Sequence, residues 1–172
     1  MRITMLAPGI AILLVFLAGC GDQSKSVDSG PDLMADSESP VAVEIVIGQG
    51  LQSNGSSISL GQDLEAAKLL YGEPDQILQL SSEMRLAHYG AQGVSMLLRP
   101  DSKVSAIYLY QPFSGTGPDG IAIGVARGAV EEALGVGEEN PFDGTVHYPA
   151  GLSVSYAENN LTAIHIVQST GK

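Results

Sequence analysis

The sequence is short of cysteine. Cys20 is the only cysteine among 172 residues. A disulfide framework, which supports many small exported domains, is therefore excluded. Any folded domain that follows Cys20 must be held together by its apolar core.

Positive charge is also scarce. The chain has 8 Lys and Arg against 19 Asp and Glu, which gives a formal net charge of −11 at pH 7. Nucleic-acid binding and electrostatic docking on anionic lipid head groups both need basic patches. We therefore expect no nucleic-acid partner, and we interpret the acidic balance as a contribution to solubility.

No hydrophobic run is long enough to span a bilayer. The longest one, residues 10–17, follows Pro8 and Gly9 and is far shorter than the ~20 apolar residues that a membrane-spanning helix needs. Arg2 precedes it, and the small residues Ala18 and Gly19 follow it. This order of a positive charge, an apolar stretch and small residues predicts a signal peptide over residues 1–19.

The end of that segment carries a second signal. The residues Leu17-Ala18-Gly19-Cys20 resemble the bacterial lipobox, in which a peptidase cleaves before a cysteine whose thiol has been diacylated. The resemblance implies a lipid on Cys20, and two acyl chains at roughly 0.8 kcal/mol per buried CH₂ are enough for stable anchoring. The alternative is an ordinary signal peptide with a chance cysteine.

The residue after Cys20 bears on localisation. It is Gly21 rather than an aspartate, which in enteric-type bacteria resembles a signal compatible with export to the outer membrane. We therefore expect an exported protein that is lipid-anchored to a bacterial membrane, with the periplasmic face of the outer membrane favoured.

Composition then divides the rest of the chain. Residues 20–40 contain the lipidated cysteine and a stretch dominated by Ser, Asp, Gly and Pro. It cannot bury a core and is predicted to be a disordered tether with a span of roughly 25 Å. Residues 41–47 are predicted to form a strand and residues 49–57 a polar loop. The expected parts are 1–19 (signal peptide), 20–40 (lipidated cysteine and tether), 41–111 (strand plus first repeat unit) and 112–172 (second repeat unit).

An internal repeat is the most informative pattern in the chain. Residues 58–61 (ISLG) align with residues 121–124 (IAIG). Apolar residues at helical spacing then predict short helices over residues 63–70 and 128–134. Gly72 and Gly135 follow these helices, where the first residue beyond a helix often adopts the left-handed conformation.

The hairpins that follow the helices also match. Residues 93–98 align with 151–156, and residues 104–109 align with 161–166. Alternation puts Val94, Met96 and Leu98 on one face of the sheet, and Ser95 and Leu97 on the other. The predicted fold class is α+β, with two tandem α-β-β-β units that form one antiparallel sheet of six or seven strands. Both helices are expected on one face, and the other face is expected to be open.

The repeated pattern resembles the SmpA/OmlA class of small outer-membrane lipoproteins. That class includes the small accessory subunit of the β-barrel assembly machinery, and the tandem form resembles the β-lactamase-inhibitor-protein architecture. The resemblance covers most of residues 58–167, and it implies a concave sheet presented to a protein partner in a non-enzymatic role. It rests on helix-end and turn positions, namely Gly61, Ala67, Tyr71, Gly72, Pro74, Gly124, Val130, Leu134 and Gly135. The second copy departs from the pattern, because Gly137 stands where the proline would be.

The residues that could carry chemistry are few. His88, His147 and His165 lack a second histidine or cysteine at ligand spacing. There is no Gly-x-Ser-x-Gly motif, and residues 114–120 lack the Lys-Ser/Thr ending of a phosphate loop. Acidic pairs such as Glu131-Glu132 are predicted to be a solvated helix face. We therefore expect no metal, no cofactor, no catalytic residue and no enzymatic activity.

The open sheet face remains as the candidate binding surface. Its predicted members are Leu97, Arg99, Tyr108, Tyr110 and His165. Tyrosine and arginine are favoured at protein interfaces, although cross-strand tyrosines also stabilise a sheet by ~0.2–1 kcal/mol per pair without any partner.

The expected function is a membrane-anchored interaction module. It would bind an unknown envelope protein, with outer-membrane or envelope assembly as the expected setting. The alternative is a small-ligand-binding or enzymatic domain whose site lies at the junction of the two repeats.

The lipidation hypothesis has a direct test. Replacement of Cys20 by alanine should leave an uncleaved or soluble product, because no thiol remains to accept the diacylglycerol. Mass spectrometry of the mature wild-type N-terminus should find Cys20 diacylated. An unmodified Cys20 at that terminus contradicts the hypothesis.

Overall fold

The computed structural model describes residues 42–168, which lie within one compact unit. The predicted signal peptide, the predicted lipidation of Cys20 and the predicted tether all fall outside the described residues. The unit is mostly antiparallel sheet with two α-helices, so the predicted α+β class is confirmed. Within residues 42–168, neither helix has the length and apolar character needed to cross a membrane.

A three-stranded antiparallel sheet opens the unit. It consists of β1 (Glu44–Val46), β2 (Gly50–Ser53) and β3 (Ser56–Ser59), in that order. The predicted polar loop over residues 49–57 was therefore wrong. Leu51 and Ile58 face each other across β2 and β3 and are buried, at 1% and 0% exposure. With a single apolar residue per strand, the sequence offers no alternation that could be recognised.

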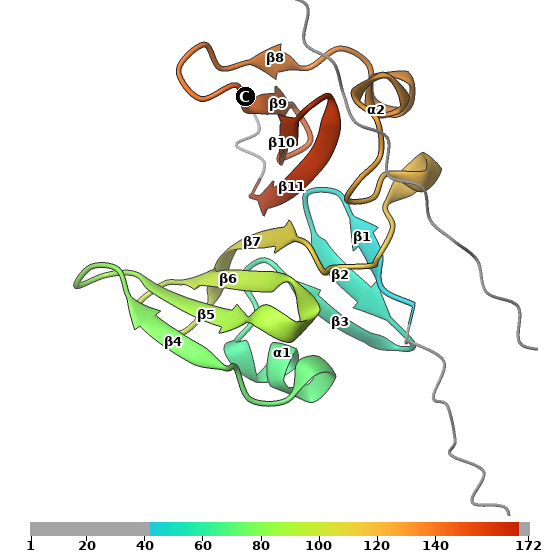
Figure 1. The fold of residues 1–172 in the computed structure, drawn as a ribbon. Coiled ribbons are helices and arrows are strands. Elements are labelled where there is room, and N and C mark those ends of the chain that lie inside the picture. The colour runs from blue at the N-terminus through green and yellow to red at the C-terminus, as the bar shows by residue number, and fades with distance from the viewer. Residues whose placement is uncertain (1–41, 169–172) are drawn as a thin grey trace, which may run out of the picture. The chain divides into compact units, whose positions relative to one another are not determined.

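The main sheet has eight antiparallel strands in the order β4-β5-β6-β7-β11-β10-β9-β8 (Figure 1). After helix α1 (Leu64–Tyr71) the chain forms β4 (Gln76–Gln79), β5 (Arg85–Tyr89), β6 (Val94–Leu98) and β7 (Val104–Tyr110). After helix α2 (Arg127–Leu134) it forms β8 (Glu138–Glu139), β9 (Val146–Tyr148), β10 (Leu152–Ala157) and β11 (Asn160–Val167). Short 3₁₀ turns η1 (Gly90–Gln92) and η2 (Pro118–Gly120) complete the elements.

Each half of the main sheet has four strands, whereas three were predicted. The additional strands, β4 and β8, form the two edges of the sheet. Every residue of both strands is exposed. Because neither strand buries a face, neither shows the alternation of apolar and polar residues by which a strand is recognised.

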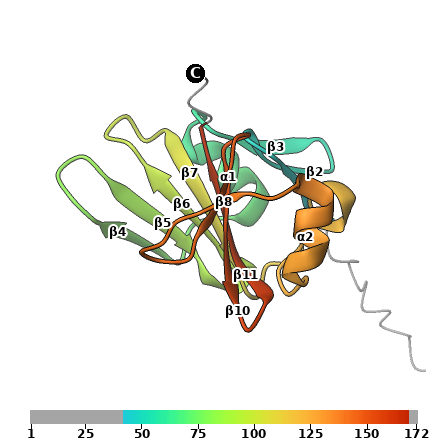
Figure 2. The same ribbon diagram turned by 90° about the horizontal axis from the view of Figure 1, so that it is seen from above.

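Both helices, α1 (Leu64–Tyr71) and α2 (Arg127–Leu134), cover the same face of the main sheet (Figure 2). The ring of Tyr71 on α1 lies 5.6 Å from the ring of Tyr89 on β5. Arg127 on α2 forms an ion pair of 2.9 Å with Glu139 on β8. Tyr89 and Glu139 point to the same face, because the strand register joins them through one line of buried residues, Val94, Leu109, Ile164, Val154 and Val146.

The helix-covered face carries the hydrophobic core, as alternation predicted. Its central residues have 0% exposure, and they are Val94, Met96, Leu98, Ile107, Leu109, Val154, Ile164 and Ile166. Tyr156, near the end of β10, is half-buried and lies beyond a register shift between Ser155 and Tyr156.

The segments that lead into the two helices are held by the same pattern of backbone hydrogen bonds. In the first half, Gly61 donates to the carbonyl of Val104 at 2.7 Å, and Val104 donates to the carbonyl of Gln62 at 2.8 Å. In the second half, Gly124 donates to Leu161 at 2.7 Å, and Leu161 donates to Val125 at 2.8 Å. Each helix therefore starts from a fixed point on the last strand of its own half.

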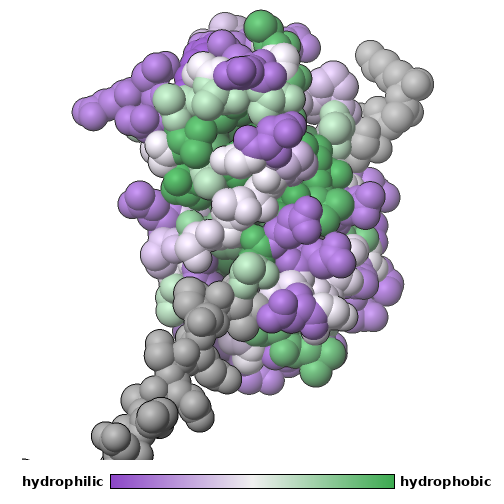
Figure 3. All heavy atoms as spheres, turned by 90° about the vertical axis from the view of Figure 1, so that its right-hand side faces the viewer, coloured by the Kyte–Doolittle hydropathy of each residue, from purple (hydrophilic) through white to green (hydrophobic). Residues whose placement is uncertain are grey.

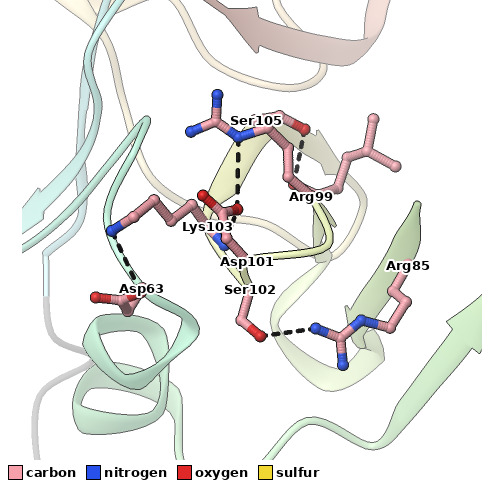
Figure 4. A network of polar contacts seen from close by, with 8 residues as sticks. Asp63, Arg85, Arg99, Asp101, Ser102, Lys103 and Ser105 are labelled. Carbon is pink, nitrogen blue, oxygen red and sulfur yellow. Dashed lines mark hydrogen bonds and ion pairs between the residues drawn. The ribbon is translucent and has the colours of Figure 1, made fainter. Parts of the chain in front are cut away.

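Helix α1 begins without a side-chain cap. Asp63 precedes α1 but makes no side-chain capping bond. Its carboxylate lies 3.4 Å from Nζ of Lys103 instead (Figure 4). The first helical N–H groups, those of Leu64 and Arg127, donate to carbonyls of the hairpin turns, at 3.2 and 2.9 Å. Turn carbonyls thus accept hydrogen bonds from N–H groups at the helix start, a role that a capping side chain normally has.

The two helices end in the same way. Gly72 has φ 79° and ψ −161°, and Gly135 has φ 79° and ψ −174°. The predicted positive φ is confirmed at both. The ψ values differ from the expected left-handed helical conformation, and they fall in a region that is essentially accessible to glycine alone.

These glycines provide a stability test. Gly72→Val and Gly135→Val should each lower the free energy of unfolding by more than ~1 kcal/mol, because valine resists positive φ. A Cβ at either position would have no heavy atom within 4 Å beyond its chain neighbours, so the loss would report backbone conformation alone. Urea titration is the measurement.

Gly128 is the matched control. It lies inside α2 with similarly open space around its Cβ. Gly128→Ala should raise the free energy of unfolding by up to ~1 kcal/mol through helix propensity. Valine variants as stable as the wild type would contradict the assignment of strain to the two helix ends.

Candidate functional site

The face of the main sheet opposite the helices carries a line of polar residues. Successive cross-strand partners are polar at every step, from β4 at one edge to β8 at the other. We call this line the polar row. Its members, in strand order, are Gln76, His88, Ser95, Tyr108, His165, Ser153, His147 and Glu138.

The centre of the polar row lies where the two halves of the sheet meet. Tyr108 on β7 is paired with His165 on β11, and their rings make an edge-to-face contact with centroids 4.9 Å apart. Both side chains are partly buried. Burial lowers the pKa of His165, an effect that the Asp143 carboxylate opposes and His147 reinforces. The lowered pKa favours the neutral imidazole.

In the first half, three side chains bond to one another. Nδ1 of His88 lies 3.0 Å from Oγ of Ser95 and 3.0 Å from the hydroxyl of Tyr110, and the two oxygens are 3.1 Å apart. The His88 and Tyr110 rings are also nearly parallel, with centroids 6.1 Å apart. This triangle fixes the orientation of the Tyr110 ring on the open face.

The second half has a simpler counterpart. Nδ1 of His147 lies 2.8 Å from Oγ of Ser153. A serine hydroxyl bonded to histidine is also the starting point of nucleophilic catalysis. Here Ser95 and Ser153 have only 5% and 9% exposure. Both sit inside paired strands whose N–H groups serve the sheet rather than an oxyanion. The arrangement satisfies buried hydroxyls across the strands.

A second line on the same face is apolar. It runs beside the polar row, and each of its members lies two residues away from the polar-row residue on the same strand. Its members are Leu78, Leu86, Leu97, Ala106 and Val167. We call it the apolar row. Its outer members, Leu78 and Val167, have 38% and 36% exposure. Apolar and polar contact surfaces therefore lie next to each other on the open face.

Four of the five residues predicted for the binding face do lie on it: Leu97, Tyr108, Tyr110 and His165. Arg99 does not extend this face. It follows the end of β6, and its Nε lies 3.7 Å from the Asp101 carboxylate in the hairpin turn (Figure 4). The cause is a register shift between Leu97 and Leu98, which ends the regular alternation before Arg99.

Sequence reasoning missed the rest of both rows. It placed Ser95 on the open face without assigning it a role, and it considered His88 and His147 only as candidate metal ligands. The sequence did carry one signal, because each histidine and its serine occur at equivalent positions of the two aligned segments. This signal could not be used without knowledge of the strand register, which places each histidine opposite its serine.

The described residues offer other surface features away from these rows. A cavity of about 260 Å³ lies at the end of α1, with Leu70, Tyr71 and Phe113 among its walls. Burial raises the pKa of Tyr71 to about 12. On the side that carries β1 and α2, hydrophobic areas are broken up by hydrophilic side chains (Figure 3). No three His, Cys, Asp or Glu side chains within residues 42–168 converge as a metal site.

Comparison with known proteins gives limited information. No protein-family model matches the sequence, and no curated protein matches it. An extracellular protein containing an SCP domain from Bacillus anthracis is similar over 67% of this chain, with 13% identity and a TM-score of 0.42. This chain spans 47% of that protein's length.

A DUF4309 family protein from Bacillus subtilis is similar over 70% of this chain and 87% of its own, with 16% identity and a TM-score of 0.43. Likenesses at this level assign no function. The resemblance to the SmpA/OmlA class remains a prediction.

The burial of His165 predicts a pH dependence of stability. Its pKa lies below the unfolded value of 6.5. As the pH falls through about 6.5, the unfolded chain therefore takes up a proton before the folded one does. The free energy of unfolding should then decrease from about pH 7.5 to about pH 5.5. His165→Gln, which cannot titrate, should flatten that decrease in chemical denaturation.

Val167→Gln is the control, because it also introduces a glutamine on β11 at a partly exposed position. It should leave the pH dependence of the wild type unchanged. Parallel pH profiles for the wild type and His165→Gln would refute the role of His165.

Proposed function

We propose that this chain is an exported, lipid-anchored envelope protein whose folded unit is a non-enzymatic protein-interaction module. Its binding surface is the open face of the main sheet. The observation that carries the proposal is the polar row, which crosses all eight strands on the face that the helices leave uncovered.

The chemistry of the face favours a protein partner. Tyr108 and Tyr110 each combine a large apolar ring with a hydroxyl, a combination that is common at interfaces. The apolar row runs beside them with Leu78 at its outer end, 38% exposed. A long surface with neighbouring apolar and polar rows suits an extended contact, whereas a small ligand needs concave walls around it.

We further propose that the two halves of the main sheet are copies of one helix-plus-four-strand unit. Matching hydrogen bonds at 2.7 Å, from Gly61 to Val104 and from Gly124 to Leu161, support this proposal. So do the Ser–His pairs, which occupy corresponding strands in the two halves. Duplication would double the width of an interaction surface without requiring a new core.

The proposed anchor gives the module its setting. The signal sequence over residues 1–19 and the lipobox-like residues that end at Cys20 support export and lipidation. A lipid-held module meets membrane-associated partners at a raised effective concentration. We propose envelope assembly at the periplasmic face of the outer membrane as the process it serves.

Site-specific photo-crosslinking in intact cells tests the binding face. A photoreactive amino acid at position 147, an exposed point of the polar row, should capture a specific envelope protein. The same group at Leu69, which is 85% exposed on α1, is the control and should capture none.

The double variant Tyr108→Ala/Tyr110→Ala should then remove the product captured from position 147. Thermal unfolding of the same variant separates binding from stability. Loss of capture by a variant that stays folded at the growth temperature supports the interface. Capture that persists, or that arises only from position 69, contradicts the proposed face.

A further inference from the structure

The two edges of the main sheet differ in chemistry. β4 stands at an outer end of the sheet in both views (Figures 1 and 2). Residues 76–82 (QILQLSS) carry no charge, and Ile77, Leu78 and Leu80 have 46%, 38% and 54% exposure. The opposite edge, β8, is two glutamates long. Short, charged edges are protected against strand addition, whereas an uncharged apolar edge invites it.

The hydrogen-bonding groups of β4 alternate in direction. Leu80 donates its N–H to the carbonyl of Met84 at 3.0 Å, across the turn to β5. In an antiparallel pair, bonded and non-bonded positions alternate. The backbone N–H and C=O groups of Leu78 therefore point toward β5, whereas those of Ile77 and Gln79 point away from β5. These outward groups meet no other strand of the described sheet.

We propose that a second copy of this chain adds to the sheet edge, with its own β4 antiparallel to the β4 of the first copy. The two copies are related by a two-fold axis that passes beside Leu78. This register places Ile77 opposite Gln79 of the second copy, and Gln79 opposite its Ile77. Both members of each pair carry outward groups, so their N–H and C=O groups bond reciprocally. Leu78 faces Leu78 of the second copy.

The faces of the two sheets match in this register. A two-fold axis normal to the sheet keeps each open face on the same side. The apolar row, which ends at Leu78 on the β4 edge, then continues into the apolar row of the second copy. The helices of both copies stay on the opposite side, where they do not obstruct the pairing.

Charge determines which edge can self-associate. Each copy has a formal net charge of −11, so the two repel at long range. β4 is an edge without charge, whereas two β8 edges would bring four glutamates together. Because salt screens the residual repulsion, the proposed dimer should tighten as ionic strength rises. The proposal does not depend on the proposed binding function.

Introduced cysteines test the register. In the full chain carrying Cys20→Ser, so that the introduced thiol is the only one, Leu78→Cys should form a disulfide-linked dimer under mild oxidation. Directly opposite residues bring their Cβ atoms to ~4.5–5.5 Å, close enough for a disulfide after small adjustments. Ile77→Cys is the matched control. It faces Gln79 of the second copy rather than itself, and it should crosslink far less.

A backbone variant tests the hydrogen bonds. Ile77→Pro removes an outward N–H and leaves the bonds from β4 to β5 intact, a position that tolerates proline on an edge strand. In sedimentation equilibrium of the full chain, it should weaken dimerisation at least about tenfold, because two reciprocal hydrogen bonds and strand contacts are lost. Its thermal unfolding should stay close to that of the wild type.

Several outcomes would overturn the proposal. The proposal is wrong if the wild-type chain stays monomeric at high salt. It is also wrong if the chain dimerises but Leu78→Cys forms no disulfide-linked dimer. Equal crosslinking from positions 77 and 78 means non-specific contact. A disulfide in cells between Leu78→Cys and a different polypeptide assigns the edge to a foreign strand instead.

Discussion

The pairing of β7 with β11 is the interaction on which the rest of the unit depends. It joins two four-strand halves in one register, from Ala106 opposite Val167 to Tyr110 opposite Ala163. That register sets Ile107 against Ile166 in the core and Tyr108 against His165 on the open face. A slip of one residue would exchange the two faces along a whole half. The single core and the continuous polar row are therefore two consequences of the same alignment.

The helices are positioned by this sheet rather than by their own ends. Each has only eight residues, too few to be stable in isolation. Neither start has a side-chain cap, and each is bonded to the last strand and turn of its half. Leu64 and Val130 then reach the core as buried residues. With the helices fixed on one face, neither helix covers the opposite face of the sheet.

The sequence allowed the interior to be predicted better than the edges. Buried apolar residues recur at every second position in β6, as with Val94, Met96 and Leu98, and this period places them correctly. Leu51 and Ile58 are equally buried, but each is alone in a four-residue strand, so no period exists to detect. β4 and β8 have no buried face at all. The position of Arg99 depended on a register shift, which is a property of two strands together and cannot be inferred from either one.

The open face is less symmetric than the fold that carries it. If the halves are copies, the apolar row segment Leu97–Ala106–Val167 has as its counterpart the line Ser155–Ala163–Tyr110, which is polar at both ends. The polar row differs at its centre, where Tyr108 in one half corresponds to His165 in the other. Substitutions in the core are constrained by packing, whereas changes on an uncovered face leave the core intact. Under the proposed function, a partner would make apolar contacts over β4–β7 and polar ones over β10 and β11. The differences between the halves, rather than the frame they share, would then determine which protein binds.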